Sequence, residues 1–130
     1  MKYVLAYVGK IKQPFRVLFD EYKKRLSIEE LCFDSRDKLN KFLENKQYVL
    51  LDEKGQEFDS LSFADFIANL NEKAIFVIGD ENGFDEKIKE NAKLKIALSK
   101  MTLPHDLAKI ILLEQVYRAE SIIKNKKYHR

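Results

Sequence analysis

The stretch Ala74-Ile75-Phe76-Val77-Ile78-Gly79 decides the fold of this chain. Its five apolar residues are consecutive and mostly β-branched or aromatic, which favours a buried strand, and the glycine marks the end of that strand. Continuous apolar strands are typical of parallel sheets, whose two faces are covered by helices. The stretch therefore predicts an α/β protein.

The same pattern recurs on both sides of this stretch. Short apolar runs predict four more strands, at residues 3–8, 28–33, 48–51 and 94–98. Apolar residues at helical spacing predict helices between them, at residues 14–26, 35–43, 62–70, 86–92 and 104–124. This alternation predicts an α/β fold in a single domain over residues 1–130, with a mainly parallel sheet flanked by helices.

Local signals refine these elements. The third strand is expected to end at Asp52, with a turn at Lys54-Gly55. Ser62, with Asp65 three residues later, resembles a capping box. Cys32 lies in the middle of a strand and is expected to be a core residue.

Composition limits the possible classes of protein. The 130 residues suffice for one domain, and 45% hydrophobic with 35% charged residues excludes a disordered chain. A single cysteine excludes an intrachain disulfide and a cysteine-based zinc site, and no cluster of His, Asp or Glu has metal-binding spacing. Without a membrane-length apolar run or a signal peptide, we expect a cytoplasmic protein with no metal and no membrane contact.

Parallel sheets usually bind ligands beyond the carboxyl ends of their strands. Those ends are predicted near Gly9, Asp52, Gly79 and Ser99. The segment from Gly79 to Gly83 is bracketed by two of the four glycines in the chain, so its backbone could approach a ligand closely. A plain turn between strand and helix would explain the same residues.

The last predicted helix is apolar around more than one side, because Ile110 to Leu113 are four consecutive apolar residues. Two explanations remain open: a homodimer interface, or burial within one chain. The segment from Arg118 to Arg130 has five basic residues and one acidic residue, so its net charge of +4 exceeds the +3 of the whole chain. With Tyr128 between the bases, this end is either an RNA contact or a solvated tail.

Two histidines occur in the chain. His105 follows Pro104 at the start of the last helix, where an imidazole tends to stay neutral and able to accept a proton. His129 belongs to the basic tail. Either one could equally be an ordinary surface residue.

Three motifs point to a known family. They are Leu98-Ser99-Lys100-Met101-Thr102-Leu103-Pro104-His105, Glu114-Gln115-Val116-Tyr117-Arg118-Ala119 and Tyr128-His129-Arg130, with support from Val8-Gly9, Val49-Leu50-Leu51-Asp52 and Phe76-Val77-Ile78-Gly79. With these motifs the chain resembles, over essentially its full length, the ribosomal RNA large-subunit methyltransferase H family. That family consists of small SPOUT (trefoil-knotted) methyltransferases.

The resemblance implies an enzyme that transfers a methyl group from S-adenosylmethionine to N3 of a pseudouridine in large-subunit (23S) ribosomal RNA. It implies a single domain with a C-terminal trefoil knot. It also implies a homodimer whose partner is ribosomal RNA or the ribosome.

The cofactor residues carry over from the family by position, and the reaction that the resemblance implies points to the other candidates. The catalytic candidate is His105. The candidates for binding ribosomal RNA are Arg118, Tyr128, His129 and Arg130. The cofactor is expected to be held by two strand ends and the loop before the last helix, namely Leu51, Gly79, Leu98, Ser99, Lys100, Met101, Thr102 and Leu103.

One segment departs from the family. Relatives usually read Gly-Gly-Pro-Glu-Gly after the central strand, whereas this chain reads Gly79-Asp80-Glu81-Asn82-Gly83. Asp80 could face a cationic sulfonium or point to solvent. A nonenzymatic RNA-binding module that has lost cofactor affinity is therefore an alternative. A flavodoxin-like nucleotide-binding domain is a second one, permitted by the α/β alternation but disfavoured by the terminal motifs.

Overall fold

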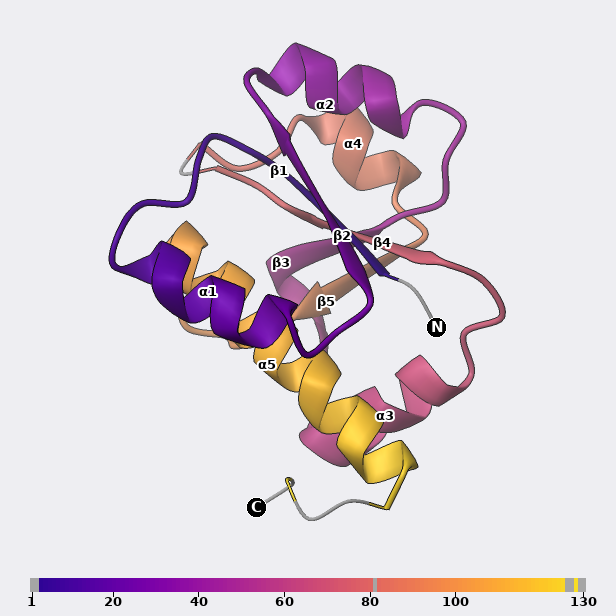
Figure 1. Ribbon diagram of the computed structural model, residues 1–130. Helices are drawn as coiled ribbons and strands as arrows, with labels where there is room; N and C mark the ends of the chain where they lie inside the picture. The colour runs from indigo at the N-terminus through magenta and orange to yellow at the C-terminus, as the bar shows by residue number, and fades with distance from the viewer. Residues whose placement is uncertain (1–2, 81, 126–127, 129–130) are drawn as a thin grey trace.

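Strands and helices alternate along the chain in the computed structural model, which describes residues 3–80, 82–125 and 128 (Figure 1). The strands are β1 (Tyr3–Val8), β2 (Ile28–Phe33), β3 (Val49–Glu57), β4 (Ala74–Ile78) and β5 (Leu94–Ala97). The helices are α1 (Phe15–Lys23), α2 (Arg36–Leu43), α3 (Ser60–Ala68), α4 (Glu86–Asn91) and α5 (His105–Ile123).

The five strands form one sheet in the order β2-β1-β4-β3-β5, and every neighbouring pair is parallel. The expected α/β fold with a mainly parallel sheet is thereby confirmed, and β4 lies at the centre of the sheet. A flavodoxin-like sheet has the order 2-1-3-4-5. The observed order differs from it, which excludes the flavodoxin-like alternative.

Helices cover both faces of the sheet. Helices α1, α3 and α5 lie on one face, and α2 and α4 lie on the other (Figure 1). Because side chains alternate along a strand, Leu5 and Tyr7 of β1 join the larger core on the α5 side, whereas Ala6 joins the smaller core beneath α2. Both cores are built from side chains of one chain.

The third strand is longer than its sequence suggests. The expected end at Asp52 and the turn at Lys54-Gly55 are wrong, because β3 continues to Glu57. Its pairing with β5 shifts register between Leu51 and Gln56, both of which pair with Ile96. Gly55 makes this possible, since a Cβ there would lie 2.6 Å from the backbone carbon of Lys95.

Two local expectations are corrected. The N-cap of α3 is Asp59, whose carboxylate accepts a hydrogen bond from the Ser62 N–H at 2.8 Å, so the capping box at Ser62 and Asp65 is wrong. Cys32 is exposed and not a core residue. Its strand, β2, is at the edge of the sheet, where fewer neighbours cover a side chain.

The apolar circumference of α5 is largely buried inside one chain. Ile110, Leu112 and Leu113 are buried, because α5 lies against the sheet and also against α1 and α3. Burial within one chain therefore accounts for most of the pattern that suggested a second copy. Within residues 3–80, 82–125 and 128, no helix is both long and apolar enough to cross a membrane.

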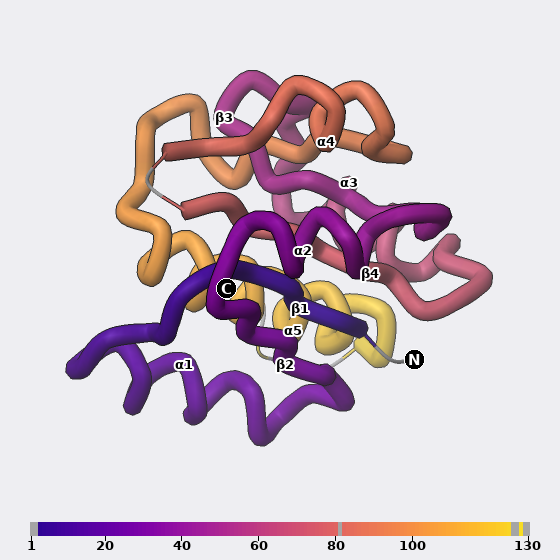
Figure 2. Tube along the Cα trace, turned by 90° about the horizontal axis from the view of Figure 1, so that it is seen from above, coloured from indigo at the N-terminus to yellow at the C-terminus, as the bar shows by residue number. Residues whose placement is uncertain are grey.

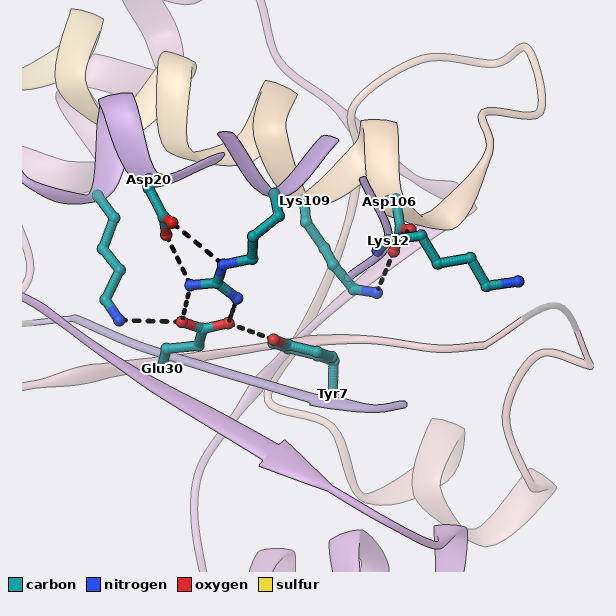
Figure 3. A network of polar contacts seen from close by, with 8 residues as sticks. Tyr7, Lys12, Asp20, Glu30, Asp106 and Lys109 are labelled. Atoms are coloured by element: carbon teal, nitrogen blue, oxygen red, sulfur yellow. Dashed lines mark hydrogen bonds and ion pairs between the residues drawn. The ribbon is translucent and has the colours of Figure 1, made fainter. Parts of the chain in front are cut away.

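A charged cluster fastens α1 to the edge of the sheet. The Glu30 carboxylate of β2 accepts hydrogen bonds from the Arg16 guanidinium at 2.7 and 2.8 Å, from the Lys23 ammonium at 2.9 Å, and from the hydroxyl of Tyr7 (Figure 3). Burial by itself raises the pKa of Glu30, but the hydrogen bonds from these side chains outweigh it and lower this pKa from 4.5 to about 2.

We expect the stability of the chain to depend on Glu30 and on pH. Because the pKa of Glu30 is lower in the folded chain, its contribution is complete above about pH 4.5 and is lost as the pH falls towards 2. Glu30→Gln should lower the free energy of unfolding at pH 7 by about 2 kcal/mol. It should also flatten the pH dependence in this window, as measured by urea unfolding.

The matched control is Glu29→Gln on the same strand. Glu29 is exposed and lies 3.9 Å from the Lys73 ammonium, so its loss should cost less than about 1 kcal/mol. A Glu30→Gln variant with the pH dependence of the unmodified chain would contradict the prediction.

Candidate functional site

A cavity of about 620 Å³ opens at the carboxyl ends of β4 and β5 and beside residues 51–53 in the middle of β3. The turn after β4 and the segment that leads into α5 form part of its wall, and the ribbon and the Cα tube both place them at the same end of the molecule (Figures 1 and 2). The volume lies in the range of small-molecule sites. Of the four positions expected to face a ligand, Asp52, Gly79 and Ser99 line the cavity and Gly9 does not, although Asp52 lies inside β3 and not at its end.

Apolar and polar groups divide the cavity wall between them. Apolar side chains come from the strand ends, from the loop before α5 and from the first turn of α5. Charged groups come from Asp52 and Glu53 of β3, from Asp80, and from Lys89 of α4. An apolar wall with a few polar and charged groups is typical of small-molecule sites.

Gly79 leaves room that a side chain would occupy. A Cβ at this position would lie 3.1 Å from the ring of Phe84 and 3.2 Å from the carbonyl oxygen of Gly83. Both neighbours also line the cavity. The glycine therefore allows the turn after β4 to fold back closely over the strand end.

The turn that departs from the family is held by its own hydrogen bonds. The Gly83 N–H donates to the carbonyl oxygen of Asp80 at 3.0 Å, and the Asn82 N–H donates to the Asp80 carboxylate at 2.9 Å. Gly83 has a φ of +77°, which favours glycine. The Asp80 side chain thus closes the turn while lining the cavity, and Glu81 lies outside the described residues.

The loop before α5 is tied to the unexpected extension of β3. The Thr102 hydroxyl donates a hydrogen bond to the Glu53 carboxylate at 2.6 Å, and the Lys100 ammonium lies 3.4 Å from the carboxylate of Glu57. Within the loop, the Met101 N–H donates to the Ser99 hydroxyl at 2.9 Å. These contacts give the loop a defined shape next to the cavity.

The structure brings most of the candidate cofactor residues together. Lys100 is the exception, because it does not line the cavity and its side chain is directed to Glu57. Sequence reasoning missed Glu53, Phe84 and Lys89; only Phe84, next to Gly83, was signalled by a motif. The cavity is lined by the catalytic candidate His105 and by the cofactor candidates Leu51, Gly79, Leu98, Ser99, Met101, Thr102 and Leu103.

The first turn of α5 carries a buried ion pair. The Lys109 ammonium lies 3.0 Å from a carboxylate oxygen of Asp106 and 4.3 Å from the centre of the Tyr7 ring (Figure 3). The other oxygen of Asp106 accepts a hydrogen bond from the backbone N–H of Lys12 at 3.1 Å. Burial raises the pKa of Asp106, but the Lys12 and Lys109 contacts outweigh it and lower this pKa.

His105 is the first residue of α5, as expected, and lines the cavity. Its Nε2 lies 3.8 Å from the Asp106 carboxylate, which is close enough for electrostatic attraction when the imidazole is protonated. The half-exposed imidazole can therefore contact a ligand in the cavity while the Asp106 carboxylate lies next to it.

A second group of candidates lies towards the far end of α5. The Arg118 guanidinium is paired with the Glu114 carboxylate and lies 5.1 Å from the centre of the Tyr128 ring. The Tyr128 hydroxyl donates to Glu114 at 3.1 Å. Arg118 comes thirteen residues after His105, about 20 Å along the helix, so this group does not join the cavity of its own chain. His129 and Arg130 lie outside the described residues.

A metal cluster is not found in the part of the chain that the structure describes. No group of three or more His, Cys, Asp or Glu side chains within it could hold a metal ion.

The fold is shared with solved methyltransferase structures. A probable methylase family protein from Haemophilus influenzae Rd KW20 matches with a TM-score of 0.64 at 11% identity, over 99% of this chain and 70% of its own. The SpoU methyltransferase AviRb from Streptomyces viridochromogenes, solved with its cofactor AdoMet, matches with a TM-score of 0.56 at 10% identity, over 92% of this chain and 60% of its own. These matches show that the chain has the fold of these methyltransferase structures.

Sequence relatives narrow this class. The profile of the family described as "Predicted SPOUT methyltransferase" matches residues 1–129. Ribosomal RNA large subunit methyltransferase H of Prochlorococcus marinus (strain MIT 9215) is 40% identical over 99% of this chain and 96% of its own length. The protein of the same name from Pseudothermotoga lettingae is 34% identical over 99% of both chains. The chain therefore belongs to the ribosomal RNA large subunit methyltransferase H family of SPOUT methyltransferases.

The buried pair at the start of α5 yields a stability prediction. Lys109→Met leaves the buried Asp106 carboxylate without its cation, so it should lower the free energy of unfolding by about 3–5 kcal/mol. Asp106→Asn should also be destabilising, and the double variant should be more stable than the sum of the two losses implies. Urea unfolding of the four chains measures this coupling.

The control is Lys87→Met on α4. Lys87 is exposed, so its replacement should change stability by no more than about 0.5 kcal/mol. Strictly additive effects of the Asp106 and Lys109 substitutions would show that the pair is not coupled.

Proposed function

We propose that this chain is a methyltransferase that uses S-adenosylmethionine to methylate N3 of a pseudouridine in 23S ribosomal RNA. The observation that carries the proposal is the cavity at the strand ends, walled by Gly79 and the loop from Leu98 to Leu103, in a chain of the methyltransferase H family. Relatives with that name support a ribosomal RNA substrate.

The residues around the cavity fit the cofactor. S-adenosylmethionine is the methyl donor, and when bound it supplies an electrophilic methyl group on a cationic sulfur. The apolar side chains of Leu51, Leu98 and Leu103 suit the flat adenine ring, because transfer of its apolar faces out of water is favourable. The carboxylates of Asp52 and Asp80 offer acceptors for hydroxyl groups and compensation for positive charge.

The protein must then position a nitrogen that holds its proton at neutral pH. His105 lies at the cavity wall and can accept a proton from N3 or hydrogen-bond a ring carbonyl, with the Asp106 carboxylate behind it. Loop residues tied down by the contact between Thr102 and Glu53 exclude water and lose little freedom on binding.

The substrate side of the proposal involves a second copy. Arg118 lies about 20 Å along α5 from His105, and Tyr128 contacts Arg118, so neither residue can hold a base in the cavity of its own chain. In a homodimer, the tail that ends in Tyr128, His129 and Arg130 would contact ribosomal RNA at the partner's cavity. The proposal also includes the C-terminal trefoil knot, the cytoplasm as location, and the ribosome or its RNA as partner.

Mapping of ribosomal RNA tests the function directly. In a bacterial strain that lacks its own gene of this family, mass spectrometry of 23S RNA should find one pseudouridine unmethylated. The unmodified chain should restore the methyl group on N3. Restoration on a different atom would overturn the assignment of N3, and no restoration together with no heat from S-adenosylmethionine in calorimetry would favour the nonenzymatic RNA-binding module.

Gly79→Val tests whether the cavity binds the cofactor. Its side chain would crowd Phe84 and the cavity, so it should weaken S-adenosylmethionine binding by at least about tenfold and abolish the methyl group. Ala68→Val on the exposed side of α3 should leave both unchanged. Unaltered cofactor affinity in Gly79→Val would place the cofactor elsewhere.

Changes at the two ends of α5 should separate chemistry from RNA binding. His105→Ala should lower the single-turnover rate by about 100-fold or more while leaving the affinities for S-adenosylmethionine and RNA unchanged. Deletion of Tyr128 to Arg130 should weaken RNA binding and spare cofactor binding. An unchanged rate in His105→Ala would remove His105 from the chemistry, and loss of cofactor binding in the deletion would indicate misfolding.

A further inference from the structure

Arg25, just beyond α1, is held between aromatic rings of two helices. Its guanidinium lies 5.3 Å from the centre of the Tyr22 ring and 5.5 Å from the centre of the Tyr117 ring of α5. The two helices are in contact along this part of the molecule (Figure 1). Although Arg25 is exposed, its position is therefore restricted by attraction to two ring faces.

The hydrogen-bond donors of Arg25 remain available. Within residues 3–80, 82–125 and 128, no carboxylate lies within ion-pair distance of its guanidinium, whereas Arg16, Arg36 and Arg118 are each paired with a carboxylate. The neighbouring lysine side chains are also paired, Lys23 with Glu30 and Lys24 with Glu21. Arg25 therefore offers an oriented positive charge that its described neighbours do not neutralise.

This arginine shares its aromatic support with the basic tail. Tyr117 contacts Tyr128 edge to face, with ring centres 4.7 Å apart, and the hydroxyl of Tyr128 lies 3.3 Å from that of Tyr22. Tyr22 and Tyr117 thus hold both Arg25 and Tyr128. A strand of RNA that reaches the tail would meet the guanidinium on the same surface.

We infer that Arg25 binds a backbone phosphate of ribosomal RNA on the surface formed by Tyr22, Tyr117 and Tyr128. This inference rests on the proposed function, because it takes ribosomal RNA as the substrate. A guanidinium presents its donors in a planar fork that matches two phosphate oxygens, and stacking on the rings fixes its orientation before RNA arrives. A phosphate contact adds affinity without adding sequence preference.

The salt dependence of RNA binding tests this contact. Affinity for a 23S RNA fragment that contains the target is measured at several salt concentrations for the full chain and for Arg25→Met, which keeps an apolar stem against the rings. The slope of log affinity against log salt should fall in magnitude by about 0.7 to 0.9, the value for one lost phosphate contact. The affinity for S-adenosylmethionine should not change.

Lys41→Met is the charge-matched control. Lys41 is exposed on α2, on the opposite face of the sheet, so the same loss of net charge should leave the slope unchanged (Figure 1). An unchanged slope in Arg25→Met, or an equal fall in Lys41→Met, would overturn the inference.

Arg25→Lys separates charge from folding. It keeps the positive charge and should retain the slope of the unmodified chain while binding RNA more weakly at every salt concentration, because it loses the planar fork. If Arg25→Met does not fold, a lowered slope in Arg25→Lys would itself overturn the inference. If the unmodified chain neither binds nor methylates RNA, the proposed function fails; if it does both and only the slope prediction is wrong, the inference about Arg25 alone fails.

Discussion

The buried ammonium of Lys109 constrains the rest of the site. A charge in the interior needs a partner at short distance, and Lys109 meets this need through Asp106 and the face of Tyr7. Since Asp106 also accepts the backbone N–H of Lys12, one carboxylate joins the start of α5 to the segment that follows β1. The first turn of α5 is thereby placed in one position, and His105 with it.

The other side of the cavity depends on a backbone approach. Because Gly55 has no side chain, its backbone can approach that of Lys95. This approach allows β3 to pair with β5 again at Gln56, after the pairing of Leu51 with Ile96. The extension places Glu53 where it accepts a hydrogen bond from Thr102, and Glu57 where it pairs with Lys100. Thr102 and Lys100 both belong to the loop before α5. The loop is therefore bounded at its end by the buried pair and along its length by the extended strand.

The elements built from continuous apolar runs were predictable, and those that depend on distant partners were not. β1, β2 and β4 occupy the predicted residues because their side chains alone favour buried strands. The predicted third strand is too short because Lys54-Gly55 is typical of a turn. The conformation of Gly55 depends instead on Lys95, forty residues away. The family motifs predicted a site at Leu51, Gly79 and the loop before α5, and these segments do line the cavity. The hydrogen bond from Thr102 to Glu53 becomes visible only in three dimensions.

The length of α5 separates Arg118 from the cavity of its own chain. A helix is stiff on the scale of one domain, so the rise per residue keeps Arg118 about 20 Å from His105 in any arrangement of a single chain. Under the proposed function, RNA must therefore touch two separate surfaces: one where the methyl group is transferred, and one where Tyr128 and Arg25 share aromatic support. A second copy that turns its tail towards the cavity would join them. Under this proposal, ribosomal RNA binds a surface that two copies form together, and the cavity of one chain is only one part of that surface.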